Sequence, residues 1–224
     1  MTSSFYRSII ITIIERRSVK EKTKESALAI IVDKEQKKKD IALSTKALIL
    51  SEGISNITIA QIAKAAGIGK GTLYEYFKNK DEIVFELVEI LMQEHNEQKE
   101  AQINKLTSTR EKVKSFFSFF YVDEDRELRE IYKQFTAISL SNPDEHMLSF
   151  QTQCYFFYEK WMETIIQEGI EKKELKPEIK DLIMGIFAFA QGAFIMSATT
   201  TAIENLQQKI DNQIDMLFDL MEER

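Results

Sequence analysis

Apolar residues recur along most of this chain at intervals of three and four, which places them on one face of an α-helix. Between residues 38 and 52 the pattern is carried by Ile41, Thr45, Leu48 and Ile49, and it stops at a glycine. Sustained alternation, the mark of a half-buried strand, is nearly absent from the sequence, as are Asn-Gly and Asp-Gly hairpin turns. The pattern therefore predicts an all-α fold of about nine helices.

Several predicted helices begin at residues that can cap the free amides of a first turn. Thr58 and Gln61 have the spacing of a capping box, in which each side chain bonds the other residue's backbone amide. The sequence STRE at residues 108–111 repeats this spacing, and Asn79 precedes two acidic residues that suit the positive end of a helix. Pro177 suits a first helical position. These signals predict where successive helices begin.

The last two predicted helices differ in the width of their apolar faces. Residues 181–196 are apolar nearly all round and are expected to be buried on several sides, whereas residues 206–221 form an amphipathic helix. No apolar run is judged to reach the roughly 18 residues of a membrane-spanning helix, so no membrane partner is predicted. The single cysteine, Cys154, cannot form an internal disulfide, which favours a reducing cytoplasm.

Charge is distributed unevenly along the 224 residues, whose net charge is −6. Residues 34–80 hold nine lysines against four acidic residues, a net +5, whereas residues 81–224 carry a net −13. A basic segment beside an acidic body is typical of a protein that binds nucleic acid through that segment. An ordinary lysine-rich surface is the alternative.

The stretch from Thr58 to Lys80, TIAQIAKAAGIGKGTLYEYFKNK, predicts two short helices joined by a glycine-containing turn. Isolated helices shorter than roughly 12–15 residues are marginal in water, so each must be held by a supporting helix. This arrangement is a helix-turn-helix, whose second helix fits the major groove of DNA. Leu73 and Phe77 are expected to enter the small core, and a purely structural helical hairpin is the alternative.

The sequence ITIAQIAKAAGIGKGTLYEYFKNKDEI, within residues 37–88, closely resembles the DNA-binding domain of the TetR family of bacterial transcriptional regulators. The rest of the chain agrees with that family in length, helix count and an apolar penultimate helix. The sequence departs from the family pattern at Ser44 and Thr45, where alanines are usual, and at Ile54, where an aromatic residue often stands. The resemblance implies a three-helix DNA-binding domain at residues 34–80, followed by a helical ligand-binding and dimerisation domain at residues 81–224.

The resemblance also implies roles for individual residues in binding double-stranded operator DNA. The residues that would contact phosphates or base edges are Thr58, Lys70, Gly71, Thr72, Tyr74, Tyr76 and Lys80. A helix N-terminus with free amides and a lysine ammonium both suit phosphate, which agrees with the roles of Thr58 and Lys80. Thr72 and Tyr76, one turn apart, would face the bases together.

The acidic body is expected to form a homodimer, because one recognition helix reads few base pairs and is doubled across a palindrome. The last two predicted helices are the candidates for the interface. The residues expected there are Gly185, Phe187, Phe189, Gly192, Phe194, Ile210, Leu217 and Phe218. The alternative is that these residues belong to the core of a single chain.

Aromatic residues are concentrated in the same body, in the knots SFFSFFY and CYFFYEKW. Aromatic side chains on facing helices can line a cavity for a small hydrophobic ligand. The candidate ligand-binding residues are Phe116, Phe120, Tyr132, Tyr155, Tyr158 and Trp161. Plain core packing is the alternative for each of them, and His95 and His146 are expected to be surface residues.

These inferences predict a cytoplasmic, sequence-specific regulator of transcription, a dimeric repressor released from a palindromic operator by a small apolar or aromatic ligand. The ligand would favour a form whose two DNA-binding domains do not match the groove spacing, with the helix from Asp81 transmitting the change. A ligand-independent DNA-binding protein of the same fold, with a nucleoid or cell-division role, is the alternative, and the sequence does not separate a repressor from an activator.

No enzyme activity, metal or cofactor is predicted. The sequence contains no Gly-rich phosphate loop, no metal-ligand spacing and no nucleophile–His–acid set. Residues 1–33 are predicted to be a poorly ordered extension, because RRSVKEKTKES is polar and highly charged. A further hypothesis places the physiological start near Leu28, at a non-standard start codon, and mass spectrometry of the native N-terminus tests it.

Overall fold

The computed structural model describes the backbone of residues 24–141 and 145–223, and the side chains from residue 34 onward within those ranges. Its α-helices are α2 (Lys24–Ser44), α3 (Lys46–Glu52), α4 (Ile59–Ala65), α5 (Lys70–Tyr76), α6 (Lys80–Ile103), α7 (Thr109–Phe117), α8 (Arg126–Ser141), α9 (Glu145–Glu171), α10 (Ile183–Thr199) and α11 (Leu206–Met221). Short 3₁₀ helices are η1 (Ser118–Phe120), η2 (Asp123–Asp125) and η3 (Pro177–Leu182). The described residues form no strand beyond an isolated antiparallel bridge between Leu175 and Glu222.

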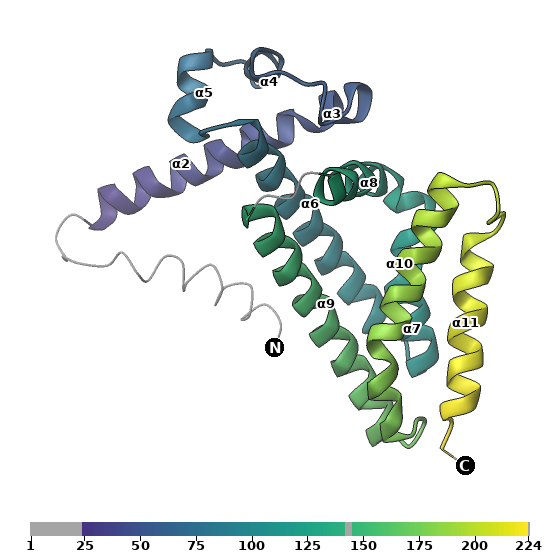
Figure 1. Ribbon diagram of the computed structural model, residues 1–224. Helices are drawn as coiled ribbons and strands as arrows, with labels where there is room; N and C mark the ends of the chain where they lie inside the picture. Colours follow the sequence, from purple (N-terminus) through teal and green to yellow (C-terminus); the bar gives the residue numbers. More distant parts are fainter. Residues whose placement is uncertain (1–23, 142–144, 224) are drawn as a thin grey trace.

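The helices are arranged as a small head on a larger bundle (Figure 1). Helices α3, α4 and α5 and the end of α2 form the head, and α6 runs from the head into the bundle of α7 to α11 (Figure 1). The all-α fold class is therefore confirmed. The described residues contain the expected number of α-helices, about nine, when α2 and α3 are counted as the single helix that the sequence predicts.

Only Thr45 separates α2 from α3. Its hydroxyl donates to the carbonyl of Ala42 at 2.6 Å, and the hydroxyl of Ser44 donates to the carbonyl of Ile41 at 2.6 Å. Hydroxyls that bond carbonyls one turn back compete with the backbone hydrogen bonds and bend or interrupt a helix. Two of the three positions that depart from the family pattern, Ser44 and Thr45, thus lie where the predicted single helix is divided.

The predicted caps are found at three helix starts. Thr58 Oγ1 accepts from the amide of Gln61 at 3.3 Å, and Gln61 Oε1 accepts from the amide of Thr58 at 2.9 Å, which completes a capping box. Asn79 accepts from the amide three residues on at 2.9 Å. Ser108 does the same at 3.4 Å, without the return bond that the STRE pattern predicts.

The buried side chains form two clusters, and the first of them joins the head to the bundle. It includes Leu73 of α5, Leu87 of α6 and Ile131 of α8. The second cluster fills the far part of the bundle, with Phe117 and Ile214 among its members. The first cluster therefore continues across the domain boundary expected before α6, so that α6 and the head pack as one unit.

Helix α10 is less buried than the sequence predicts. Its covered face packs on α9, α11 and η1, while Met184 and Met196 on the other face are 68% and 51% exposed. The segment Pro177–Thr199, which begins with η3, is long and apolar enough to cross a membrane by composition, with a mean hydropathy of 1.7, so the sequence-based statement that no run approaches this length is wrong. Because one face packs in the bundle, the remaining apolar residues form an open surface on the other.

The N-terminal predictions fall largely outside the described residues. Helix α2 begins at Lys24, inside the segment expected to be an extension, and residues 1–23 are not described. The hypothesis of a start near Leu28 concerns this region of the chain and stays a hypothesis.

Candidate nucleic-acid interface and internal cavity

Helices α4 and α5 are joined by a turn that depends on glycine. Gly67 has a φ of 67°, a left-handed conformation that a side chain disfavours. The Gly67 amide donates to the carbonyl of Lys64 at 3.1 Å, and the Ile68 amide donates to the carbonyl of Ala63 at 3.0 Å. These two bonds form a Schellman motif, which satisfies the last carbonyls of α4 and fixes the direction in which the chain enters α5.

Helix α5 is held in the head by its buried face. Leu73 and Phe77 are buried with Ile62 of α4, as the sequence predicts. The ammonium of Lys38 on α2 lies 5.3 Å from the centre of the Phe77 ring, a cation–π contact. The two short helices therefore have a fixed relative orientation, although neither would be stable alone.

The opposite face of α5 is open to solvent. Lys70, Gly71 and Tyr74 are exposed, whereas Thr72 and Tyr76 are half-buried and the Tyr76 ring rests against the first cluster. A Cβ added to Gly71 would meet no atom within 4 Å, so the fold itself does not require a glycine there. The helix thus presents hydroxyls, an amine and bare backbone at a surface that fits a major groove.

Thr58 and Lys80 lie at the starts of α4 and α6, beside the turns of the head. Thr58 is exposed, and its hydroxyl also donates to Gln61 at 2.7 Å. Lys80 Nζ donates to the carbonyls of Ile54 and Ser55 at 2.8 and 3.2 Å. Because an ammonium has three donors, one remains for a phosphate while the other two hold the turn between α3 and α4. The sequence did not indicate this second role of Lys80.

An acidic cleft of about 520 Å³ lies beside the C-terminal end of α5, where α5 approaches α2 and α6. Its carboxylates are those of Glu75, Glu82, Glu86 and Glu89. Burial raises the pKa of Glu86 above its ordinary value, and the nearby Lys38 offsets part of the effect. Carboxylates repel phosphates, so this cleft favours the N-terminal half of α5 as the part that meets nucleic acid.

A separate cavity of about 160 Å³ lies inside the bundle, between α6, α7, η1, α8, α9 and α10. All six aromatic residues selected from the sequence line it: Phe116, Phe120, Tyr132, Tyr155, Tyr158 and Trp161. Their rings meet mostly edge to face, as Phe116 and Trp161 do with centroids 5.1 Å apart. The structure thus brings residues from four separate elements around one space.

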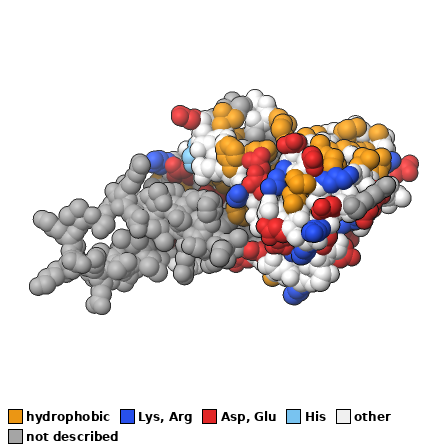
Figure 2. All heavy atoms as spheres, turned by 90° about the horizontal axis from the view of Figure 1, so that it is seen from below, with side chains coloured by type: hydrophobic (Ala, Val, Ile, Leu, Met, Phe, Trp, Pro, Cys, Tyr) orange, Lys and Arg blue, Asp and Glu red, His pale blue; other side chains and the backbone are white. Residues whose placement is uncertain are grey.

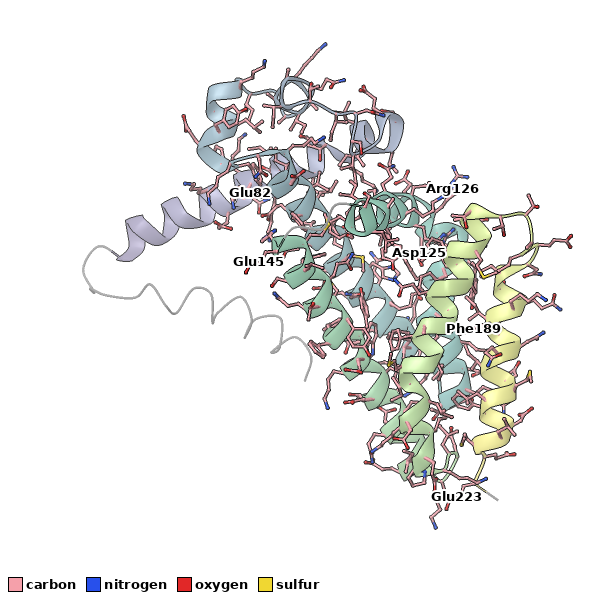
Figure 3. The ribbon with its side chains drawn as sticks, in the orientation of Figure 1. Glu82, Asp125, Arg126, Glu145, Phe189 and Glu223 are labelled. Atoms are coloured by element: carbon pink, nitrogen blue, oxygen red, sulfur yellow. The ribbon has the colours of Figure 1, made fainter. Side chains whose placement is uncertain are left out.

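Polar residues of α6 also reach this cavity. Lys99 is 7% exposed, its Nζ donates to Ser118 Oγ at 2.8 Å, and it lies 3.9 Å from Asp125 Oδ2. Burial lowers the pKa of Lys99, because it disfavours the charged form, and Asp125 offsets part of this. His95 Nδ1 lies 3.0 Å from Asp125 Oδ1 (Asp125 is labelled in Figure 3).

The burial of His95 corrects one prediction. Its side chain is 11% exposed, so the expectation that it is a surface residue is wrong, whereas His146 is exposed as predicted. Burial acts to raise the pKa of Asp125, but its hydrogen bond with His95 and the charges of Lys99 and Arg129 outweigh this, so the pKa lies below its ordinary value. At the polar end of the cavity, His95, Lys99 and Asp125 therefore interact with one another and are largely shielded from solvent.

Helix α8 contacts both the cavity and the head. Tyr132 lines the cavity, and its hydroxyl accepts from Gln191 of α10 at 2.9 Å. Two residues further on, Gln134 Oε1 accepts from the amide of Ile54 in the head at 2.7 Å. The sequence analysis missed Gln134, for which the only signal is a polar residue next to the apolar face of an amphipathic helix. A displacement of α8 at the cavity would therefore also move the turn between α3 and α4, to which Gln134 is hydrogen-bonded.

The eight residues predicted for a dimer interface divide into two groups. Those packed within the chain or against the cavity are Phe187, Phe194, Ile210 and Phe218. Those that keep a side toward solvent are Gly185, Phe189, Gly192 and Leu217. A Cβ added to either glycine would meet no atom within 4 Å, so packing inside the chain does not explain them.

An apolar groove of about 200 Å³ runs between α10 and α11 and is lined by Gly185, Phe189 and Leu217. Phe189 is labelled on α10 in Figure 3. Four exposed apolar residues that the sequence analysis missed stand on the same two helices: Met184, Met196, Met216 and Leu220. Figure 2, which views the molecule from below, shows hydrophobic side chains exposed among charged ones.

The described residues do not suggest a metal site or a reactive thiol. No group of three or more His, Cys, Asp or Glu side chains among them could hold a metal ion. Cys154 lines the cavity, and burial raises its pKa to about 11, with a smaller effect from Glu89. The thiol is therefore neutral near pH 7 and a weak nucleophile.

Comparison with known protein families gives a match in the head. The family described as "Bacterial regulatory proteins, tetR family" matches residues 42–87, which run from the end of α2 into α6. The fatty acid metabolism regulator protein of Bacillus subtilis (strain 168) is 28% identical over 131 residues, 58% of this chain and 66% of that protein. The alignment thus spans slightly less than two thirds of that relative.

Comparison with solved structures extends the likeness of fold to the bundle. A transcriptional regulator of the TetR family from Cytophaga hutchinsonii superposes with a TM-score of 0.71 at 16% identity, over 86% of this chain and 98% of that one. A putative transcriptional regulator from Saccharomonospora viridis, in complex with choline, superposes with a TM-score of 0.67 at 16% identity, over 81% and 95%. The head and the bundle are therefore found together in other proteins.

Proposed function

The chain belongs to the TetR family of bacterial transcriptional regulators, and on that premise we propose that it is a homodimeric repressor, released from a palindromic operator by a small apolar or aromatic ligand. Members of this family are DNA-binding regulators and not enzymes. The site of action is the cytoplasm, where operator DNA is found.

The open face of α5 supports the DNA-binding part of this proposal. Lys70, Gly71 and Thr72 lie in its N-terminal half, away from the acidic cleft, and would read base edges. Tyr74 and Tyr76 line that cleft, whose carboxylates repel phosphates, so of their expected contacts those with base edges fit the geometry better than those with the backbone. Thr58 and the remaining donor of Lys80 would bind phosphates on either side. Phosphate contacts fix the position of the head, and base contacts give the sequence preference.

The apolar surface of α10 and α11 supports the dimer. Two copies of these helices would form a four-helix interface in which Gly185 and Gly192 allow close approach, with Phe189 and Leu217 in contact with the partner. Exposed methionines and leucines at the same surface would be removed from water in the dimer. Pairing at this end of the molecule leaves both heads free to contact DNA.

The observation that carries the ligand-release proposal is that α6 and α8 each contact both the cavity and the head. Helix α6 supplies Lys99 to the cavity and begins at Lys80, whereas α8 supplies Tyr132 to the cavity and Gln134 to the head. A ligand that prefers a different separation of these helices would change the distance between the two recognition helices of the dimer. The affinity for the operator would fall by the ligand's differential affinity for the two forms.

The relatives support a small ligand in general terms. The name of the Bacillus subtilis relative places that protein in fatty acid metabolism, and the Saccharomonospora viridis structure contains choline. Titration of the complex between the protein and its operator, once selection from random duplexes has identified that operator, with apolar and aromatic compounds tests the proposal. Loss of operator binding on addition of a ligand supports the sensor, whereas binding indifferent to every ligand that enters the cavity favours the ligand-independent, nucleoid or cell-division alternative.

A further inference from the structure

The lining of the cavity restricts the chemistry of the ligand. Among the described residues no carboxylate lines it, and the basic side chain in the lining is that of Lys99, which lies 3.9 Å from the Asp125 carboxylate outside the lining. The other polar groups include His95, the side-chain amides of Asn96 and Gln191, and tyrosine hydroxyls. A cationic ligand would face the Lys99 ammonium, while the Asp125 carboxylate that offsets part of this charge is not among the lining residues. The polar part of the ligand is therefore an acceptor or an anion.

Lys99 has donors available for such a group. Its ammonium donates a hydrogen bond to Ser118 Oγ, and its ion pair with Asp125 is long, at 3.9 Å, which is beyond hydrogen-bond distance. Asp125 uses its other oxygen for His95, and its Oδ2 has no hydrogen-bond partner. A buried ammonium has a high desolvation cost unless it is fully paired, and a helix that needed only packing at this position would carry an apolar residue. An anion in the cavity would complete the pairing of Lys99.

The rest of the cavity suits a single aromatic ring. Its walls are rings from α7, η1, α8, α9 and α10, including Phe116, Trp161 and Phe187. Its volume is about 160 Å³. A protein cavity of about 150 Å³ holds one benzene molecule. There is thus room for one ring and little more than a carboxylate attached to it, and a single ammonium is better matched by a monovalent carboxylate than by a phosphate dianion.

We propose that the ligand is a small aromatic carboxylic acid, bound as its anion with the carboxylate on Lys99 Nζ and the ring among the aromatic walls. The inference rests on the proposed function, because it names the ligand of the sensing cavity. This ligand differs from the choline bound by the Saccharomonospora viridis protein, because choline is a cation, whereas the Lys99 ammonium in this cavity favours an anion.

Trp161 is the single tryptophan of the chain and lines the cavity, so intrinsic fluorescence reports its occupancy. Three probes of similar shape are titrated into the full-length protein: benzoate, benzamide and benzylammonium. The acid is expected to change Trp161 fluorescence saturably and to bind at least about tenfold more tightly than the amide, with the ammonium weakest. Equal affinity for acid and amide, or tighter binding of the ammonium, overturns the proposal.

Substitution of Lys99 tests the contact itself. Lys99→Met keeps the length and volume of the side chain and is expected to weaken binding of the acid about tenfold while leaving the amide unchanged. Lys105→Met, at an exposed lysine after the same helix, is the matched control and should behave as the unsubstituted protein. An acid affinity unchanged by Lys99→Met in a folded protein, checked by circular dichroism, contradicts the contact. If that variant does not fold, the proposal is tested by the order in which the unsubstituted protein binds the three probes.

Two further outcomes separate this inference from the proposed function. Dodecanoate, added as a fourth probe, should bind more weakly than benzoate, and tighter binding of the long chain overturns the aromatic, single-ring part of the inference. If the acid binds with the expected ranking but does not release operator DNA, the ligand class stands and the release mechanism fails. If no probe of any charge alters Trp161 fluorescence, both the cavity's sensing role and the ligand class fail.

Discussion

Gly71 and Gly67 are four residues apart, but the fold requires only one of them. Gly67 has a left-handed φ of 67°, whereas Gly71 lies in helix α5 with open space at its Cβ position. Gly71→Ala is expected to raise the free energy of unfolding by up to about 1 kcal/mol, because alanine loses less conformational entropy in a helix. The same methyl group would stand on the face that is proposed to meet DNA, so operator affinity should fall.

Thermal unfolding and operator titration measure the two effects of Gly71→Ala separately. Gly67→Ala is the control, since its strained conformation should lower stability. An operator affinity of Gly71→Ala equal to that of the unsubstituted protein would show that the DNA does not approach this part of α5.

Tyr76 has two roles that different substitutions can separate. Its ring rests against the first cluster, and its hydroxyl is expected at the base edges. Tyr76→Ala should cost roughly 1–3 kcal/mol in operator binding, together with some stability. Tyr76→Phe keeps the ring and removes only the hydroxyl, so its effect should be confined to binding and to one position of the operator. Titration of single-base operator variants checks this, and an unaltered preference in both proteins would be evidence against the contact.

Lys80 holds the turn between α3 and α4 and is proposed to bind a phosphate, so its substitution should affect both stability and DNA binding. Lys80→Ala is expected to weaken binding to every duplex alike and to reduce the slope of log K against log salt by about 0.9 for one lost phosphate contact. It should also lower the unfolding free energy, because the carbonyls of Ile54 and Ser55 lose their donor. Lys78→Ala, at a side chain that is 90% exposed, should leave stability unchanged. A salt slope identical to that of the unsubstituted protein would exclude Lys80 from the phosphate contacts.

At the scale of helices, local signals predicted most of the fold. The capping residues Thr58 and Asn79 and the buried pair Leu73 and Phe77 are found as expected, because caps and apolar periodicity depend on neighbours in sequence. The division at Thr45 was missed, since a hydroxyl competes with the backbone only weakly and the outcome depends on packing in the head.

The polar end of the cavity could not be predicted from periodicity. His95 and Lys99 are polar residues on a long helix, and such residues usually face solvent. They are buried because η1 and the residues before α8 fold over that face of α6, a contact between segments about 20 to 30 residues apart. The six aromatic residues of the cavity were found more easily, since their clustering is visible in the sequence.

Helix α8 gives a prediction about the link between the bundle and the head. Gln134→Leu removes the acceptor of the Ile54 amide, and leaving that buried group unpaired should cost about 1–3 kcal/mol of stability. Glu127→Gln breaks the exposed pair with Lys46, 2.7 Å long, and should cost less stability than Gln134→Leu, because solvent screens an exposed ion pair. Chemical denaturation compares the two variants. If Glu127→Gln is the more damaging, the connection through α8 is not the one described.

At the scale of the whole molecule, the apolar surface of α10 and α11 predicts the oligomeric state. Met216 is 63% exposed on α11, and Met216→Glu should place a charge in the dimer interface and yield a single chain in solution. Operator affinity should fall with it, because one head reads only half of the palindrome. Leu148→Glu, at a residue 55% exposed on α9, is the matched control and should remain dimeric. Sedimentation velocity measures the oligomeric state of both variants. If Met216→Glu remains dimeric, the interface lies elsewhere.

The central claim is that two copies of this chain present α5 to the major groove of a palindromic site. Selection of bound duplexes from a random pool, followed by measurement of mass for the complex with the enriched sequence, tests it most directly. The expected result is an inverted repeat with half-sites about one helical turn apart, or a multiple of that distance, and an even number of protein chains on each duplex. Absence of any enriched sequence, or a single chain bound to a site without two-fold symmetry, would contradict the claim.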